Sequence, residues 1–257
     1  RARRAFVKTS GNTILITGGA TGIGYALAEA FLAHGNQVAI CGRREDRLRE
    51  AAKSHPELRT LAADVATEAG RAALVQWATS QLKGLNVLVN NAGIQRDIDF
   101  TKGIGDYRSG PSEIGINFEA PILLSGMLIP HLAGKPEAAI VNVSSGLGFV
   151  PAARMPVYSA TKAGLHAFSM ALRHQVKPLG IKVYELIPPA IDTELNPEGR
   201  AARGGWKVDL KPPEFVAAVM KGLASDSFEI GFGTTERSIR ASREELEKSF
   251  QQMNSRW

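Results

Sequence analysis

The sequence predicts an α/β protein with one doubly wound parallel sheet of about seven strands and helices on both faces. Short apolar runs alternate with segments of helical period along most of the chain. A glycine-rich turn joins the first apolar run to the first helical segment. The chain has 257 residues, 44% of them hydrophobic and 22% charged, which suits a single domain over 1–257 and excludes disordered and fibrous classes.

The first two strands and the helix between them form the clearest unit. Thr13–Thr17 is a short apolar run bounded by glycines, the pattern of a buried parallel strand. Apolar residues then recur at helical spacing from Gly24 until Gly35 ends the helix, and Gln37–Cys41 is expected as the next strand. This succession predicts a βαβ unit.

The same alternation continues to residue 187. Helices are expected over 44–54, 68–81, 112–131 and 157–176, and strands over 58–62, 87–90, 139–143 and 182–187. Parallel neighbours need a crossover, which here is a helix each time, so the strands are expected to run parallel.

Two segments break the alternation. Residues 192–210 hold three glycines, one proline and seven charged residues, which predicts a substrate lid, with a disordered loop as the alternative. Residues 242–257 open with a Ser-x-x-Glu capping box and predict a C-terminal helix or tail. Its apolar face, which is expected to cover the same subunit or a partner, carries Leu246, Phe250, Met253 and Trp257.

Composition excludes several kinds of site and partner. Cys41 is the only cysteine and the five histidines are dispersed, so neither a disulfide nor a metal site is expected. The net charge of +6 comes from scattered residues and aromatic content is 7%, which argues against nucleic acid. No apolar run is long enough to span a membrane, and no apolar core follows the basic residues 1–4, so a cytoplasmic protein is expected.

The glycine-rich turn Thr17–Gly24 indicates a dinucleotide site. Gly18, Gly22 and Gly24 allow a tight turn and close approach of a pyrophosphate, which then meets the positive end of a helix. The spacing differs from G-x-G-x-x-G, but the position directly after the first strand favours a Rossmann-type nucleotide site over a structural turn. A Walker lysine is missing from the turn, which excludes an NTPase.

Tyr158 and Lys162 form the candidate catalytic pair. Their spacing of four residues places a phenol beside an ammonium on one helix face, where the cation favours the phenolate and the pair can exchange a proton. Ser144 and Ser145 follow the strand 139–143 at the sheet edge where ligands bind, so a hydroxyl is expected in the same crevice. The alternative is an ordinary surface pair.

With these motifs in this order, the chain resembles the classical short-chain dehydrogenase/reductase superfamily from about Asn12 to Ile230. The motifs that carry the resemblance are Thr17–Gly24, Asp64–Val65, Asn90–Gly93, Asn117, Ser145 and Tyr158–Lys162. The stretches 91–95 and 187–195 also look like a bacterial branch linked with D-alanine esterification of teichoic acids, a link from which no substrate is inferred.

The resemblance implies an NADP(H)-dependent carbonyl reductase or alcohol dehydrogenase acting on a small molecule. In such an enzyme Tyr158 is the general acid or base, and Ser145 binds the substrate oxygen, with Ser144 as an alternate. Lys162 lowers the pKa of the tyrosine and holds the nicotinamide ribose, and Asn117 supports a proton-relay water. A nucleotide-binding redox sensor or scaffold of the same fold is the alternative function.

The resemblance also implies the cofactor contacts. They are Gly18, Thr21, Gly22, Ile23, Gly24, Asp64, Val65, Asn91, Ala92, Gly93, Tyr158, Lys162, Ile191 and Thr193. Asn91 and Gly93 have an alternative reading as turn residues, and Asp64 as a helix cap. Ala190 stands where the family commonly has glycine, a departure that leaves the backbone geometry near the nicotinamide amide open.

The end of the second strand predicts the choice of cofactor. An NAD site commonly has an acid here, whereas this chain has Gly42-Arg43-Arg44. Arg43 is therefore expected to pair with a 2′-phosphate, which makes NADP(H) the preferred cofactor and NAD(H) the alternative. If Arg43 instead stacks on the adenine, either cofactor is tolerated.

A homodimer or homotetramer is expected. The helix over 157–176 carries Leu165, His166, Phe168 and Leu172, more apolar surface than one sheet face covers. The resemblance implies that this helix pairs with the helix over 112–131 between subunits.

Overall fold

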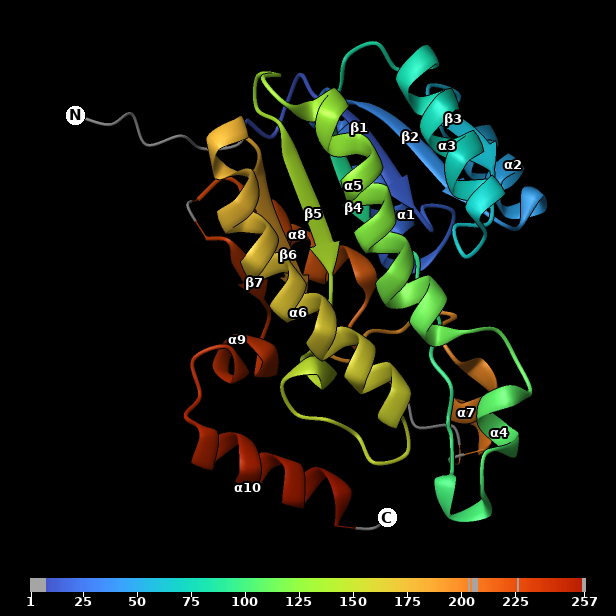
Figure 1. Cartoon of the computed structure of the whole chain (residues 1–257), viewed down its shortest axis with the longest axis vertical. Coiled ribbons are helices and arrows are strands. Elements are labelled where there is room, and N and C mark those ends of the chain that lie inside the picture. The colour runs from blue at the N-terminus through green and yellow to red at the C-terminus, as the bar shows by residue number, and fades with distance from the viewer. Residues whose placement is uncertain (1–7, 203, 205–207, 226, 256–257) are drawn as a thin grey trace.

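The computed structural model describes residues 8–202, 204, 208–225 and 227–255 (Figure 1). The elements in chain order are β1 (Thr13–Thr17), α1 (Gly22–Ala33), β2 (Gln37–Gly42), α2 (Glu45–Ser54), β3 (Arg59–Ala62), α3 (Glu68–Gln81), β4 (Leu85–Asn90), the 3-10 turn η1 (Phe100–Lys102), α4 (Gly105–Arg108), the π turn η2 (Gly115–Glu119), α5 (Ala120–Leu132), β5 (Ala139–Val143), the 3-10 turn η3 (Gly146–Gly148), α6 (Pro156–Val176), the 3-10 turn η4 (Lys177–Leu179), β6 (Lys182–Ile187), α7 (Pro197–Ala202), α8 (Pro212–Leu223), β7 (Glu229–Gly231), α9 (Thr234–Ser238) and α10 (Arg243–Asn254).

The seven strands form one parallel sheet in the order β3-β2-β1-β4-β5-β6-β7, which confirms the predicted fold class. The chain builds outward from β1 to β3, then returns to pair β4 with the other edge of β1. At this reversal the crossover helices leave to opposite faces, so a crevice opens beyond the carboxyl ends of β1 and β4.

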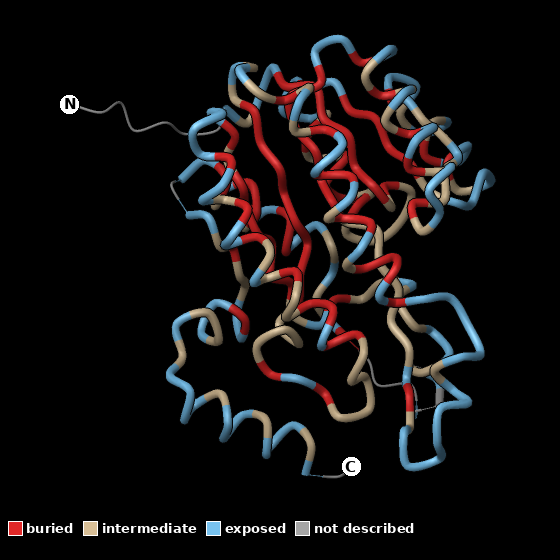
Figure 2. Tube along the Cα trace, in the orientation of Figure 1, coloured by how far each residue is buried: buried red, intermediate tan, exposed pale blue. Residues whose placement is uncertain are grey.

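Strand alternation divides the core into two layers, one on each face of the sheet. Ile14 and Ile16 of β1 pack with α1, α2 and α8, whereas Leu15 packs on the other face with α3, α5 and α6. The buried strands lie between these helices (Figure 2). The two layers hold the strand ends in fixed positions, and the strand ends carry the candidate site.

Most predicted elements agree with the structure within two residues. The clearest difference lies in the helix expected over 112–131, which begins as the π turn η2 before α5 continues it. Periodicity over a long window cannot reveal one extra residue in a turn, and π turns are frequent at functional sites. Asn117, a predicted site residue, lies in this turn and is fully buried.

The lid segment 192–210 and the C-terminal segment contain helices. The lid segment includes α7, while its residues 203 and 205–207 lie outside the described part. Ser242 caps α10 through the predicted capping box, yet α10 has no buried residue and Met253 is 50% exposed. Residues 1–4 and Trp257, named above, also lie outside the described residues. Within the described ranges no helix combines the length and apolarity needed to cross a bilayer.

Candidate active site

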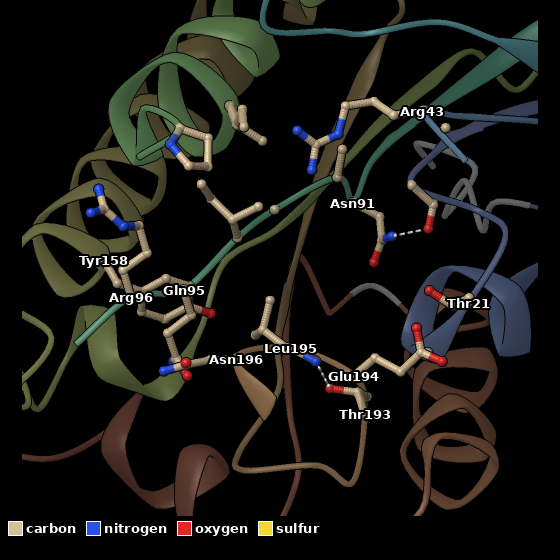
Figure 3. A pocket seen from close by; sticks show the side chains of 18 of the residues that line it. Thr21, Arg43, Asn91, Gln95, Arg96, Tyr158, Thr193, Glu194, Leu195 and Asn196 are labelled. Carbon is tan, nitrogen blue, oxygen red and sulfur yellow. Dashed lines mark hydrogen bonds between the residues drawn. The ribbon is translucent and has the colours of Figure 1, made fainter. Parts of the chain in front are cut away.

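A cavity of about 990 Å³ opens beyond the carboxyl ends of the central strands (Figure 3). The predicted site residues that line it are Gly18, Thr21, Gly22, Ile23, Arg43, Asp64, Val65, Asn91, Ala92, Gly93, Tyr158, Lys162 and Thr193. Ser144 also lines it, whereas Gly24, Asn117, Ser145 and Ile191 are not among its lining residues. The structure therefore brings the glycine turn and the tyrosine–lysine pair to one cavity.

The glycine turn is closely packed against the end of β4. Gly18 has a φ of +62°, and a Cβ atom there would lie 2.8 Å from Cα of Ala92. A Cβ atom on Gly24 would collide with the carbonyl of Gly18 and the side chain of Asn91. Thr21 is the N-cap of α1, but its side chain makes no hydrogen bond to the first turn of that helix. The backbone N–H groups of this first turn therefore remain available to an anion.

Asn91 holds the glycine turn in place. Its Nδ2 donates to the carbonyls of Thr17 and Gly18, each at 3.0 Å. In return, Oγ1 of Thr17 accepts from the backbone N–H groups of Asn91 and Ala92, each at 3.0 Å. The amide of Asn91 therefore joins β4 to the turn, while its side chain also lines the cavity.

Asp64 does not cap α3. The N-cap of that helix is Thr67, whose Oγ1 accepts from the N–H of Gly70 at 3.0 Å. Asp64 accepts instead from the N–H of Ala66 at 3.0 Å and lines the cavity beside Val65. This local turn presents both residues at the end of β3.

Tyr158 and Lys162 are both buried at the inner end of the cavity. Nζ of Lys162 lies 5.6 Å from the ring centroid of Tyr158 and donates to the carbonyl of Val143 at 2.7 Å. Ser145 Oγ accepts from the N–H of Leu147 at 3.1 Å, and its hydroxyl acts to lower the pKa of the Tyr158 phenol. A hydroxyl, a phenol and an ammonium thus meet in one place.

Burial controls the pKa values of this pair. It raises the pKa of Tyr158 to about 12, against the opposing hydrogen bond of Ser145. It lowers the pKa of Lys162 to about 8, although the carboxylate of Glu185 acts in the other direction. The structure differs here from the expectation that the lysine lowers the pKa of the phenol. The reason is that burial disfavours both charged forms, so at neutral pH the phenol keeps its proton.

The two adjacent serines differ in what their hydroxyls contact. Ser144 Oγ donates to Oε1 of Glu185 at 2.5 Å, so its proton already forms a hydrogen bond with a buried carboxylate. Oγ of Ser145 accepts from the N–H of Leu147 instead, and its own proton forms no hydrogen bond with a carboxylate of the described residues. This geometry favours Ser145 over Ser144 as the group that meets a substrate oxygen.

Asn117 and Ile191 are buried and are not among the lining residues of the cavity. The amide of Asn117 exchanges two hydrogen bonds of 2.8 Å with the backbone of Ile94 and donates to Thr161 at 3.3 Å. Ile191 belongs to the hydrophobic core. Among the described non-glycine residues only Glu137 and Asn196 have positive φ, so the backbone at Ala190 suits alanine.

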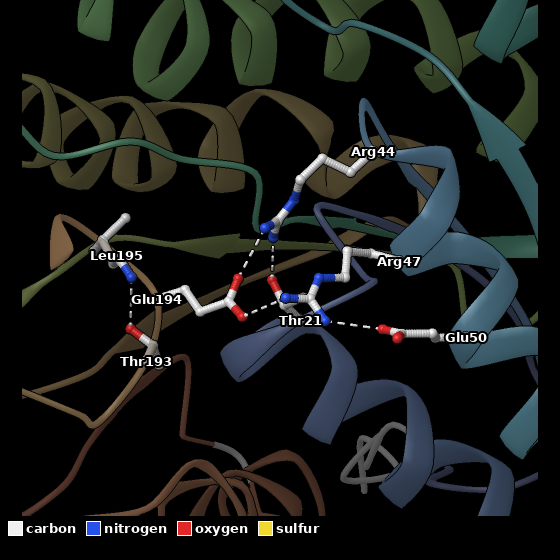
Figure 4. A network of polar contacts seen from close by, with 7 residues as sticks. All are labelled: Thr21, Arg44, Arg47, Glu50, Thr193, Glu194 and Leu195. Carbon is white, nitrogen blue, oxygen red and sulfur yellow. Dashed lines mark hydrogen bonds and ion pairs between the residues drawn. The ribbon is translucent and has the colours of Figure 1, made fainter.

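A polar network that the sequence did not reveal lies at the cavity rim (Figure 4). Glu194 of the lid segment pairs with Arg44 at 2.9 Å and with Arg47 at 3.3 Å, and Arg44 also donates to Oγ1 of Thr21 at 3.1 Å. Arg43 lines the same cavity and forms no ion pair among the described residues. Arg44 was visible in the sequence, but its partner Glu194, 150 residues away in the lid segment, was not.

Glu113 and the outer wall of the cavity were also missed. Glu113 is 2% exposed, its Oε1 accepts from the N–H of Arg96 at 3.0 Å, and its Oε2 has no hydrogen-bond partner among the described residues. Burial raises the pKa of this carboxyl. The outer wall is polar and includes Gln95, Arg96, Asp97, Asn196 and Glu198.

Comparison with known proteins agrees with this geometry. The model of the short chain dehydrogenase family matches residues 12–204. A Bacillus subtilis (strain 168) protein named "Uncharacterized oxidoreductase DltE" is 46% identical over 249 residues, which cover 97% of this chain and 99% of that protein.

Solved structures give the same result. A short-chain dehydrogenase from Sphingobium yanoikuyae in complex with NADPH is 27% identical, with a TM-score of 0.76 over 93% of this chain and 96% of that one. A Burkholderia phymatum short chain dehydrogenase/reductase in complex with NAD shares the fold, at 21% identity and a TM-score of 0.81 over 94% and 96% of the two chains. By the family match, the sequence identity and the fold, this chain belongs to the short-chain dehydrogenase family.

Proposed function

We propose that this protein is an NADP(H)-dependent oxidoreductase that transfers a hydride between the nicotinamide and a carbonyl or alcohol substrate. The observation that carries the proposal is the buried Ser145, Tyr158 and Lys162 group at the inner end of a cavity whose other end is the glycine turn. Membership of a dehydrogenase family supports it.

The cavity suits a dinucleotide. At Gly18 the turn packs so closely on Ala92 that no side chain fits there. The first turn of α1 offers free N–H groups to a pyrophosphate. Lys162 would hold the nicotinamide ribose, with Gly93 opposite it, since a Cβ atom there would lie 3.7 Å from Nζ. Asp64 and Val65 would flank the adenine, and Thr193 would meet the carboxamide end. When bound, the cofactor supplies or accepts the hydride.

Side chains of the protein supply the proton that carbonyl reduction requires. With a pKa raised to about 12, Tyr158 holds its proton at neutral pH and can donate it to an alkoxide formed from a carbonyl. The hydroxyl of Ser145 orients the same oxygen. This protonation state favours carbonyl reduction, so the first assay is NADPH oxidation with aldehydes and ketones. Because the outer wall is polar, hydroxylated and amide-bearing carbonyls belong in that panel.

Arg43→Asp is expected to raise KM for NADPH more than KM for NADH. Arg43 lines the cavity, and its guanidinium pairs with no carboxylate of the described residues, so a 2′-phosphate can engage it. Loss of a charge-assisted contact costs about 1–3 kcal/mol, and steady-state kinetics with both cofactors measures it. Arg49→Asp is the matched control, because Arg49 pairs with Glu45 on the exposed side of α2. Equal effects on both cofactors would show that Arg43 does not bind the phosphate.

We propose that the enzyme is a homo-oligomer, although only His166 and Phe168 of the four residues first predicted for the interface are partly exposed. Leu165 and Leu172 are buried within their own chain, because α6 packs them against the sheet. The apolar residues that α5 and α6 expose are Leu123, Met127 and Met170, at 36%, 40% and 52%.

Met127→Glu is therefore expected to shift a dimer or tetramer toward the monomer, since a charge on this face opposes its burial. Light scattering measures the molar mass in solution, which is compared with the mass of one chain. Met253→Glu on α10 is the control. A wild-type protein that is a monomer at assay concentration contradicts the prediction.

We further infer that residues 192–210 cover bound substrate, because Glu194 ties the start of this segment to α2 at the cavity rim. An enzyme of this kind acts where its cofactor is supplied, so the cytoplasm remains the expected compartment.

A further inference from the structure

An ion pair between buried Glu185 and partly buried His166 lies beside the turn that carries Ser145. Glu185 of β6 is fully buried, and its two carboxylate oxygens have different partners. Oε1 accepts from Oγ of Ser144 at 2.5 Å, and Oε2 lies 2.8 Å from Nδ1 of His166. His166 follows Lys162 by four residues on α6, so the helix face that carries the candidate catalytic pair continues into this ion pair.

The ion pair contacts both ends of the turn that carries Ser145. Ser144 precedes Ser145 and is held by Glu185. At the other end, the ring of Phe149 lies 4.6 Å from the imidazole of His166. Between the two contacts the chain forms the short turn η3, which Ser145 caps. A movement of either partner would therefore shift the serine hydroxyl relative to the phenol of Tyr158.

Charged groups of both signs surround the pair. Glu229 of β7 brings a carboxylate oxygen within 4.8 Å of the ligand atoms of His166 and Glu185, and Arg173 of α6 lies 3.6 Å from Glu229. With His166 protonated, these two carboxylates face three cations, because Lys162 also interacts with Glu185, and this lowers the cost of burying Glu185. The hydrogen bond with Glu185 is the main cause that raises the pKa of His166.

A proton fits this cluster better than a metal ion. His166, Glu185 and Glu229 are close enough to converge on a cation. However, both oxygens of Glu185 already take part in hydrogen bonds, and a divalent ion would lie near the guanidinium of Arg173. Binding such an ion would break the contact to Ser144 or to His166 and add positive charge beside a cation.

We propose that Glu185 and His166 are positioning residues that hold the Ser145 turn in its catalytic geometry, and that this hold depends on the proton of His166. The role in catalysis rests on the function proposed above, whereas the ion pair and its contacts with the turn do not. Neither side chain needs to touch substrate, since they act through Ser144 and Phe149.

The pH dependence has a definite sign. Because the folded-state pKa of His166 is raised, the ion pair contributes its full stability below the unfolded-state value of 6.5 and loses it as pH rises through the folded value. Above that point Glu185 faces a neutral imidazole, with Lys162, Arg173 and Glu229 as the remaining charged neighbours. Turnover is then expected to fall.

The first test needs no substrate. In NMR titrations of the full chain, His166 is assigned by comparison with His166→Gln, and its midpoint is expected above 6.5 in the wild type. Glu185→Gln keeps the size of the side chain and should move that midpoint down. The backbone amides of 145–149 should titrate with the same midpoint in the wild type and lose this response in both variants. The proposal is overturned if Glu185→Gln leaves the His166 midpoint unchanged. It is also overturned if the backbone amides of 145–149 do not titrate with that midpoint in the wild type.

The second test measures catalysis with NADPH and the best carbonyl of the panel. Glu185→Gln and His166→Gln should lower kcat on the order of 10- to 100-fold, the effect of a reacting group misplaced by about an ångström, without weakening NADPH binding. His166→Gln should also remove the fall of kcat at the midpoint measured by NMR. Glu229→Gln is the control, because it removes a nearby carboxylate that does not contact the serine turn, and it should keep kcat close to wild type.

The outcomes separate the two proposals. Wild-type kcat and pH profiles in both variants, with unchanged melting temperatures, would refute the positioning role. A loss of kcat in Glu229→Gln equal to that in Glu185→Gln would refute it too, by indicating a general charge effect. If the wild type turns over no carbonyl, the proposed function fails, and the amide titration still decides whether the ion pair controls the turn.

Discussion

Replacing Tyr158 by phenylalanine is expected to lower kcat for carbonyl reduction on the order of 10²- to 10⁴-fold, the usual contribution of a positioned general acid. The phenol is buried beside Ser145 and holds its proton at neutral pH, because burial raises its pKa to about 12. Phenylalanine removes this proton donor and almost nothing else. The dissociation constant for NADPH should therefore stay near the wild-type value, and fluorescence titration measures it.

The control for this variant is Tyr107→Phe. It deletes the same hydroxyl from a half-buried tyrosine in α4, in a part of the chain away from Lys162. Its kcat should remain close to wild type. Turnover by Tyr158→Phe at the wild-type rate would remove Tyr158 from the mechanism and, with it, the proton step of the proposed function.

Lys162→Met is expected to lower both kcat and cofactor affinity. Its ammonium lies over the ring of Tyr158 and faces the cavity where the ribose would bind. Loss of hydrogen bonds to a charged group should weaken NADPH binding by about 1.5–3 kcal/mol. A variant with reduced kcat but unchanged NADPH binding would exclude the ribose contact.

The same residue gives a pH prediction. Burial lowers the pKa of Lys162 to about 8, so its ammonium is present below that pH and is lost as pH rises through it. NADPH binding should weaken over this range. Lys162→Arg keeps its charge to much higher pH and should bind NADPH with little change across it. A wild-type affinity that is flat from neutral pH to well above 8 contradicts this assignment.

The strands and the glycine turn could be predicted because local sequence determines them. Thr13–Thr17 and Lys182–Ile187 are apolar runs long enough to show where each strand starts and ends. β7 has three residues, too few to show a period, and it was not located. The π turn at Asn117 was missed because one additional residue in a turn does not alter the spacing of apolar residues along the whole helix.

The candidate site was predictable where motif residues lie close in sequence, as Tyr158 and Lys162 do. Contacts between distant segments were not predictable. Glu194 meets Arg44 across 150 residues, and Ser144 meets Glu185 across 41, so only the folded sheet brings them together. The raised pKa of Tyr158 was missed for a related reason, because the spacing shows a neighbouring cation but not the depth of burial.

The most direct test of the central claim is a paired assay of NADPH oxidation by wild type and Tyr158→Phe over the carbonyl panel, with the alcohol product quantified. At least one carbonyl is expected to be reduced, with one alcohol formed per NADPH consumed, whereas Tyr158→Phe is expected to bind NADPH but to yield almost no product. A wild-type protein that binds NADPH and reduces no carbonyl, or a Tyr158→Phe variant that matches the wild type, would contradict it.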